Sequence, residues 1–208
     1  MRITVVTPTY NKLHLLRRTL ASLEAQDIGA DRFELVVVDD GSSDGTEEYL
    51  REYEAPFGLE VVRAPANRGR AAARNRGLER ASGALVVFLD DVVLVPGFLL
   101  AHHELHAGCA RVSGIGNLVN HPEVTMAPVD RYMSTRGAQK IKTRGPLPWR
   151  YFSTNNSSVL RADLDAVGGF DEDFRYYGFE DLEIAYRLQR QRGLEFRFVE
   201  AARSLHIP

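Results

Sequence analysis

The chain has 208 residues, of which 44% are hydrophobic and 26% charged, values typical of an ordinary globular domain. Its formal net charge of −2 provides no general attraction to nucleic acid or to an anionic membrane surface, so neither is expected as a partner. The single cysteine, Cys109, excludes an internal disulfide, and no run reaches the roughly 18 apolar residues of a membrane span. We therefore expect a soluble, cytoplasmic protein.

The first half of the chain alternates between apolar runs and amphipathic segments. Strands are expected at residues 2–7, 33–38, 59–63 and 84–89. Helices are expected between them, at residues 12–26, 44–54 and 69–81. Such alternation is typical of right-handed βαβ units. The sequence thus predicts an α/β fold with a doubly wound, mostly parallel sheet, and a Rossmann-like nucleotide-binding half over about residues 1–95.

The second half of the chain is less regular. Residues 119–150 are rich in proline, glycine and basic residues and predict a long functional loop. Order returns as a strand, a turn and a helix, which are expected at residues 152–160, 168–171 and 180–191. We expect both halves to form one domain over residues 1–208, with the second half at about residues 96–208.

Two adjacent carboxylates, Asp90 and Asp91, end the most apolar of the expected strands. Burying neighbouring like charges is unfavourable unless water or a cation solvates them. The end of such a strand is also where open α/β sheets collect ligands. The pair therefore predicts a divalent metal ion held together with a second anion, and oxygen ligands favour Mn²⁺ or Mg²⁺ over Zn²⁺. The alternative is a solvated turn, a common place for aspartate.

Another acidic pair follows the expected strand at residues 33–38. The Asp40 carboxylate can accept a hydrogen bond from the imide N–H of a pyrimidine base. The alternative is that Asp40, followed by glycine and serine, simply forms a turn, since these residue types are common in turns. We favour a ligand role for Asp40 and a capping role for Asp44, and Asp39 stays open.

A basic cluster surrounds the start of the helix expected at residues 69–81. Arginine suits bidentate phosphate recognition, and Arg70 and Arg74, four residues apart, share one helix face. They are the better candidates for phosphate contacts, although most basic runs are simply solvated. His102 and His106 have zinc-compatible spacing but no evident third ligand, so a partly exposed helix face is expected there.

Six short patterns stand in a characteristic order along nearly the whole chain. They are Val5 to Asn11, Val36 to Thr46, Asn67 to Gly69 with Ala73 to Asn75, Phe88 to Asp91, Gly168 to Glu172, and Gly178 to Leu182. Together they resemble glycosyltransferase family 2, the inverting, nucleotide-sugar-dependent enzymes with the GT-A fold. The resemblance implies that an acceptor hydroxyl displaces the nucleotide diphosphate of a donor sugar, with UDP as the default nucleotide.

The resemblance also implies where the donor binds. Asp40 would bind the base, with the turn of Pro8 and Tyr10 beside it, and Asp90 would lie next to the bound nucleotide sugar. Asp91 and His206 would be the protein ligands of Mn²⁺ or Mg²⁺ bridging the diphosphate.

Asp181 would be the general base, by the same resemblance. Its alternative role is capping, because the helix macrodipole favours acidic residues in the first turn. Glu180 and Trp149 are candidates for binding the acceptor, and the alternative for Trp149 is a position in the core. The resemblance implies a glycan, a lipid-linked molecule or a small molecule as the acceptor, and a role in polysaccharide biosynthesis.

The chain departs from the family pattern in one respect that bears on the metal. Val92 follows Asp91, where the family often has a third carboxylate. The alternative function is therefore a non-catalytic sugar-nucleotide or glycan-binding module of a larger assembly, with a further domain or an oligomer partner completing the acceptor site.

Overall fold

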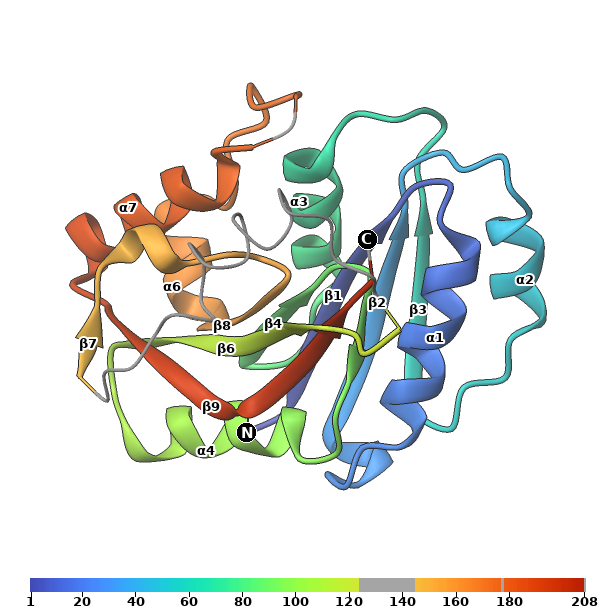
Figure 1. The fold of residues 1–208 in the computed structure, drawn as a ribbon. Coiled ribbons are helices and arrows are strands. Elements are labelled where there is room, and N and C mark those ends of the chain that lie inside the picture. The colour runs from blue at the N-terminus through green and yellow to red at the C-terminus, as the bar shows by residue number, and fades with distance from the viewer. Residues whose placement is uncertain (124–144, 177, 208) are drawn as a thin grey trace.

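The computed structural model of the chain describes residues 1–123, 145–176 and 178–207. Its first half forms the parallel part of one large sheet (Figure 1). The strands are β1 (Ile3–Thr9), β2 (Phe33–Asp39), β3 (Gly58–Arg63) and β4 (Leu85–Leu89). The helices are α1 (Leu13–Glu24), α2 (Thr46–Glu52) and α3 (Arg70–Arg80), and a short 3₁₀ helix, η1 (Ala30–Arg32), precedes β2. Every predicted boundary of these strands and of the three α-helices lies within two residues of the observed one.

Side chains that alternate along these strands fill two cores, one on each face of the sheet. Val5 and Val87 belong to the core beneath α1, together with Leu16 and Leu20 of that helix. Phe88 belongs to the opposite core, which α3, α6 (Arg161–Val167) and α7 (Glu180–Arg192) cover. Because both faces are covered, β1 and β4 are buried along almost their whole length, which explains the continuous apolar sequence of β4.

The second half extends the sheet with mixed pairings. Its strands are β5 (Val92–Leu94), β6 (Val112–Asn120), β7 (Pro146–Leu147), β8 (Asn156–Leu160) and β9 (Glu195–His206). Its remaining helices are α4 (Phe98–Gly108) and the 3₁₀ helix η3 (Trp149–Tyr151). The strand order is β3-β2-β1-β4-β8-β6-β9-β5, and β7 pairs with β9. Antiparallel pairing of β8 with β4 joins the two halves into one sheet, and the α/β fold class is confirmed.

Several elements of this half were not predicted. The sequence did not predict β5, β6, β9 or α6, and the strand predicted at residues 152–160 begins at Asn156 in the structure. Much of the loop predicted at residues 119–150 lies outside the described residues; of the rest, residues 119–120 end β6 and residues 146–147 form β7. No helix in the described part of the chain has the length and apolar character needed to cross a bilayer.

The helix carrying His102 and His106 differs from expectation, because both imidazoles are buried beneath the sheet. His102 Nδ1 and His106 Nε2 lie 2.8 and 2.9 Å from Ser158 Oγ, and His102 Nε2 lies 3.1 Å from Asn156 Oδ1. Burial lowers the pKa of His102 to about 3 and that of His106 to about 4, so both are neutral hydrogen-bonding groups. The prediction that these two histidines lie on a partly exposed helix face was therefore wrong.

Candidate active site

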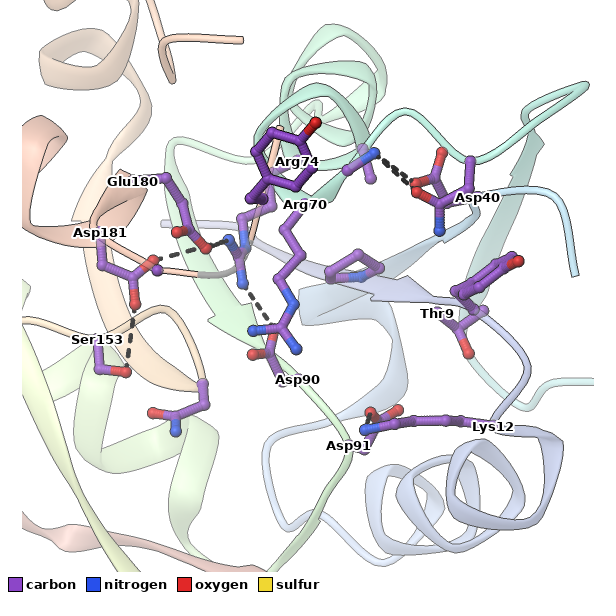
Figure 2. Close-up of a pocket in the computed structure, with 18 of the residues that line it drawn as sticks. Thr9, Lys12, Asp40, Arg70, Arg74, Asp90, Asp91, Ser153, Glu180 and Asp181 are labelled. Atoms are coloured by element: carbon purple, nitrogen blue, oxygen red, sulfur yellow. Dashed lines mark hydrogen bonds and ion pairs between the residues drawn. The ribbon is translucent and has the colours of Figure 1, made fainter. Parts of the chain in front are cut away.

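A cavity of about 450 Å³ opens at the carboxyl ends of β1, β2 and β4, beside the first turns of α3 and α7 (Figure 2). Ten of the eleven residues singled out from the sequence line it: Pro8, Tyr10, Asp40, Arg70, Arg74, Asp90, Asp91, Glu180, Asp181 and His206. Parallel strands place their carboxyl ends at one edge of the sheet, which brings residues so distant in sequence together.

Trp149 is the exception. It packs edge-to-face against Tyr186 of α7, with ring centroids 5.7 Å apart, and it contacts the core between the sheet and that helix. The structure therefore gives Trp149 the packing role that was its alternative, and Trp149 is not among the residues that line the cavity.

Arg74 is the electrostatic centre of the cavity wall. Its side chain is only 1% exposed, yet it donates hydrogen bonds to Asp90 Oδ1 at 2.9 Å and Glu180 Oε1 at 3.0 Å. A third carboxylate, that of Asp181, lies 3.6 Å away (Figure 2). A buried arginine needs such partners, and these acids equally need its charge. Arg74 is thus engaged by carboxylates, in contrast to the phosphate contact expected from the sequence.

Asp181 lies in the first turn of α7 and faces the cavity. Its carboxylate accepts hydrogen bonds from Thr154 Oγ1 at 2.9 Å, from the Thr154 amide at 3.2 Å and from Ser153 Oγ at 3.4 Å. Burial raises the pKa of Asp181 above its ordinary value, although the nearby Arg74 charge opposes that shift. A raised pKa makes a carboxylate a stronger base near neutral pH.

Asp40 holds the loop that leads into α3. Its two carboxylate oxygens accept hydrogen bonds from the amides of Arg68 and Gly69, at 2.9 to 3.1 Å. Burial raises the pKa of Asp40, which these amide contacts partly counteract. A carboxylate has about four acceptor positions, so Asp40 retains capacity for a ligand in the cavity that it lines.

The neighbouring acids Asp39 and Asp44 have structural contacts. Asp39 Oδ1 accepts a hydrogen bond from the Ser42 amide at 2.8 Å. Asp44 accepts from the Leu13 amide at 2.8 Å and from the Thr46 amide at 3.3 Å, so it satisfies a backbone donor in the first turn of α1 and another in that of α2. The capping role favoured for Asp44 agrees with these contacts.

Asp91 forms the opposite wall of the cavity with Lys12 and His206. Asp91 Oδ2 lies 2.7 Å from Lys12 Nζ, whereas Asp91 Oδ1 is buried without a hydrogen-bond partner among the described residues. Pairing of β5 with β9 places His206 opposite Val92, the residue after Asp91. Burial, together with the Lys12 charge, lowers the pKa of His206 and favours the neutral imidazole that can ligate a metal.

These donors fit a divalent cation that takes further ligands from a substrate. The partnerless buried oxygen of Asp91 is an oxygen donor of the kind that Mn²⁺ and Mg²⁺ prefer. No cluster of three or more His, Cys, Asp or Glu side chains suited to a metal occurs within residues 1–123, 145–176 and 178–207. Mg²⁺ sites in nucleotide enzymes commonly use one or two protein ligands plus phosphate oxygens and water, so the small number of donors here is compatible with such a site.

Other residues that line the cavity were given no role from the sequence. Lys12 was expected only to begin a helix, and Ser153 and Arg175 lie in irregular segments without a motif. Gly69 has φ +92°, and a Cβ there would lie 3.0 Å from the Arg175 carbonyl oxygen, so a glycine permits the two cavity walls to meet. Gly69 belongs to one of the sequence patterns, whereas only the close approach of distant segments identifies Lys12, Ser153 and Arg175.

Comparisons with known proteins agree with this geometry. Residues 4–102 match the model of glycosyl transferase family 2, and residues 136–208 match a model described as the N-terminal domain of galactosyltransferase. Validoxylamine A glucosyltransferase of Streptomyces hygroscopicus subsp. jinggangensis is 34% identical over 89% of this chain and 51% of its own length. Chondroitin synthase of Escherichia coli is 31% identical over 98% of this chain and 34% of its own length.

A solved structure extends the likeness to the fold. The mannosyltransferase PcManGT of Pyrobaculum calidifontis, in complex with GDP-Man and Mn²⁺, superposes with a TM-score of 0.76 at 27% identity, over 99% of this chain and 56% of that protein. The chain spans about half the length of the curated glucosyltransferase that it matches. One family model matches most of the first half of the chain and another matches much of the second half, and the relatives resemble the chain in both fold and sequence. The chain belongs to glycosyltransferase family 2 and has the GT-A fold.

Proposed function

We propose that the chain transfers a sugar from a nucleotide-diphosphate donor to an acceptor hydroxyl with inversion at the anomeric carbon, and that Asp181 is the general base. The observation that carries this proposal is one cavity that is lined both by the partly buried carboxylate of Asp181 and by the acidic pair Asp90-Asp91. The donor would bind to the half at about residues 1–95, and the acceptor would approach from the half at about residues 96–208.

In the proposed reaction the acceptor oxygen attacks the anomeric carbon while its proton passes to a carboxylate oxygen of Asp181. The bond between that carbon and the diphosphate oxygen breaks, and its electron pair leaves with the diphosphate. Thr154 and Ser153 hold the Asp181 carboxylate by hydrogen bonds on the side of the β8 turn. Arg74 stabilises the ionised form of Asp181 between turnovers.

The leaving group requires positive charge on the other wall. Asp91 and His206 would hold Mn²⁺ or Mg²⁺, which would stabilise the negative charge developing on the diphosphate. Arg70 and Lys12 line the same part of the cavity and supply further positive charge. The turn of Pro8 and Tyr10, with Asp40, would enclose the base.

The donor is proposed as UDP-linked, as the family default. A relative of solved structure holds GDP-Man, so guanosine donors belong in the same screen. A thermal-shift screen of nucleotide sugars with and without Mn²⁺ would identify the donor, because a ligand that binds the folded state raises the melting temperature.

The decisive experiment replaces the base. Asp181→Asn should lower turnover by about 100-fold or more, with donor binding retained. Asp173→Asn, a change of the same kind at an exposed position, is the control. Removing divalent metal with a chelator should also stop release of free nucleotide diphosphate. If Asp181→Asn turns over at the control rate, the assignment of the base is wrong.

A non-catalytic sugar-nucleotide or glycan-binding module is the second candidate. The small number of metal ligands from the described residues favours it. Tight nucleotide binding in calorimetry, with no turnover by the wild-type chain across a panel of sugar acceptors, would decide for this module and against the enzyme.

A further inference from the structure

The side chain of Lys12 forms an ion pair with Asp91, the carboxylate that would bind the proposed metal. Lys12 stands at the start of α1, and its ammonium lies 2.7 Å from Asp91 Oδ2. Figure 2 shows the Lys12 side chain extending toward Asp91, and both residues line the cavity. No motif marked this lysine, and the proposed reaction uses it only as a nearby positive charge.

A lysine and a divalent cation compete for the same place. Both are attracted by the Asp91 carboxylate, and they repel each other at the short separation that sharing it would require. The second oxygen, Asp91 Oδ1, is buried without a hydrogen-bond partner in the described structure, so a bound cation would supply the partner that this oxygen lacks. Arrival of the metal therefore favours departure of the ammonium.

The ion pair is also of a kind that breaks readily. The Lys12 side chain is 44% exposed, and its long stem reaches solvent, so water can solvate the ammonium once it leaves Asp91. Lysine is a flexible point charge, unlike the rigid fork of an arginine. Because Lys12 lines the cavity, its ammonium can move onto an incoming anion there.

We propose that Lys12 is an exchangeable cation that makes binding of the metal and of the donor's diphosphate interdependent. Without ligands it neutralises Asp91; when the metal binds to Asp91, the ammonium transfers to the diphosphate. This inference rests on the proposed function, since it concerns the same donor site. It predicts weak binding of metal alone and much tighter binding of metal with nucleotide, which is a coupling between two ligands.

The test compares Lys12→Gln with Arg17→Gln in the full chain. Arg17 lies on the same helix, over the ring of Tyr49, and its replacement removes the same charge away from the cavity. Calorimetry would measure the dissociation constant of Mn²⁺ alone. It would then measure that of UDP or GDP, whichever binds more tightly, at saturating Mn²⁺.

The two constants should change in opposite directions in Lys12→Gln. Mn²⁺ alone should bind about fivefold more tightly or better, because its competitor is gone. The nucleotide at saturating Mn²⁺ should bind about tenfold more weakly, because a charged phosphate contact is lost. Arg17→Gln should resemble the wild type in both.

Two results would overturn the inference while leaving the proposed donor site in place. One is equal affinity of wild type and Lys12→Gln for Mn²⁺ alone, and the other is weaker binding of both ligands by Lys12→Gln. If the wild type binds no Mn²⁺ even with nucleotide present, the metal-assisted function fails, and the role of Lys12 fails with it.

Discussion

Replacing Arg74 by methionine should destabilise the protein strongly and in a pH-dependent way. Arg74 is 1% exposed and pairs with Asp90 and Glu180, while Asp181 lies 3.6 Å from it. At that separation and an effective dielectric of about 20, one pair of unit charges attracts by about 4.6 kcal/mol. Desolvation of the guanidinium offsets part of this attraction. The variant, however, leaves carboxylates without their counter-charge.

Removing one partner from a buried ion pair costs about 3–5 kcal/mol. For a chain of this size, a loss of that magnitude corresponds to a fall in melting temperature of roughly 6–20 °C. Arg80→Met is the matched control, because Arg80 lies on the same helix and pairs with Glu60 while its own side chain is 59% exposed. An exposed pair is worth about 0–1 kcal/mol.

The pH dependence follows from Asp181. Burial already raises its pKa above 3.8, and loss of the Arg74 charge, which lowers that pKa, should raise it further. When the pKa of a carboxyl is higher in the folded state than in the unfolded state, the protein becomes less stable as the pH rises from 3.8 through the folded-state pKa. The stability difference from wild type should therefore be larger at about pH 8 than at about pH 5.

Thermal and urea unfolding at the two pH values would measure this difference. The reasoning is refuted if Arg74→Met loses no more stability than Arg80→Met, or if its loss is the same at both pH values. Either result would mean that the carboxylates around Arg74 do not depend on its charge.

Three further outcomes are expected. Gly116→Ala should lower the unfolding free energy by about 1–3 kcal/mol in urea titrations, because the added Cβ would lie only 1.8 Å from Asn156 Oδ1; unchanged stability would mean that the strands shift freely. Asp44→Ala should lower stability by about 1 kcal/mol, since the Leu13 amide loses its acceptor, and calorimetric melting would detect it. Buried His102, with a pKa of about 3, should stay neutral at about pH 5 in an NMR titration, and stability should fall as the pH drops from 6.5 towards that value; a titration midpoint near 6.5 would contradict its burial.

The regular half of the fold could be predicted because its signals are local. Strands buried on both faces are continuous apolar runs, and the helices between them are marked by their own spacing. The second half resisted prediction because β9 is a long strand whose burial varies along its length, paired with segments far away in sequence. Its pairing partners, rather than its own residues, decide that it is a strand.

The site divides in the same way. The sequence by itself determined that Asp40, Asp90 and Asp91 follow strands, and parallel pairing then requires these strand ends to share an edge of the sheet. Only the tertiary structure decided the partners of these charges. Arg74 meets acids that stand 16, 106 and 107 positions further along the chain, and Lys12 meets Asp91 across the cavity. Charge and hydrogen-bond contacts depend on distance in space, which the order of residues does not specify until the sheet has formed.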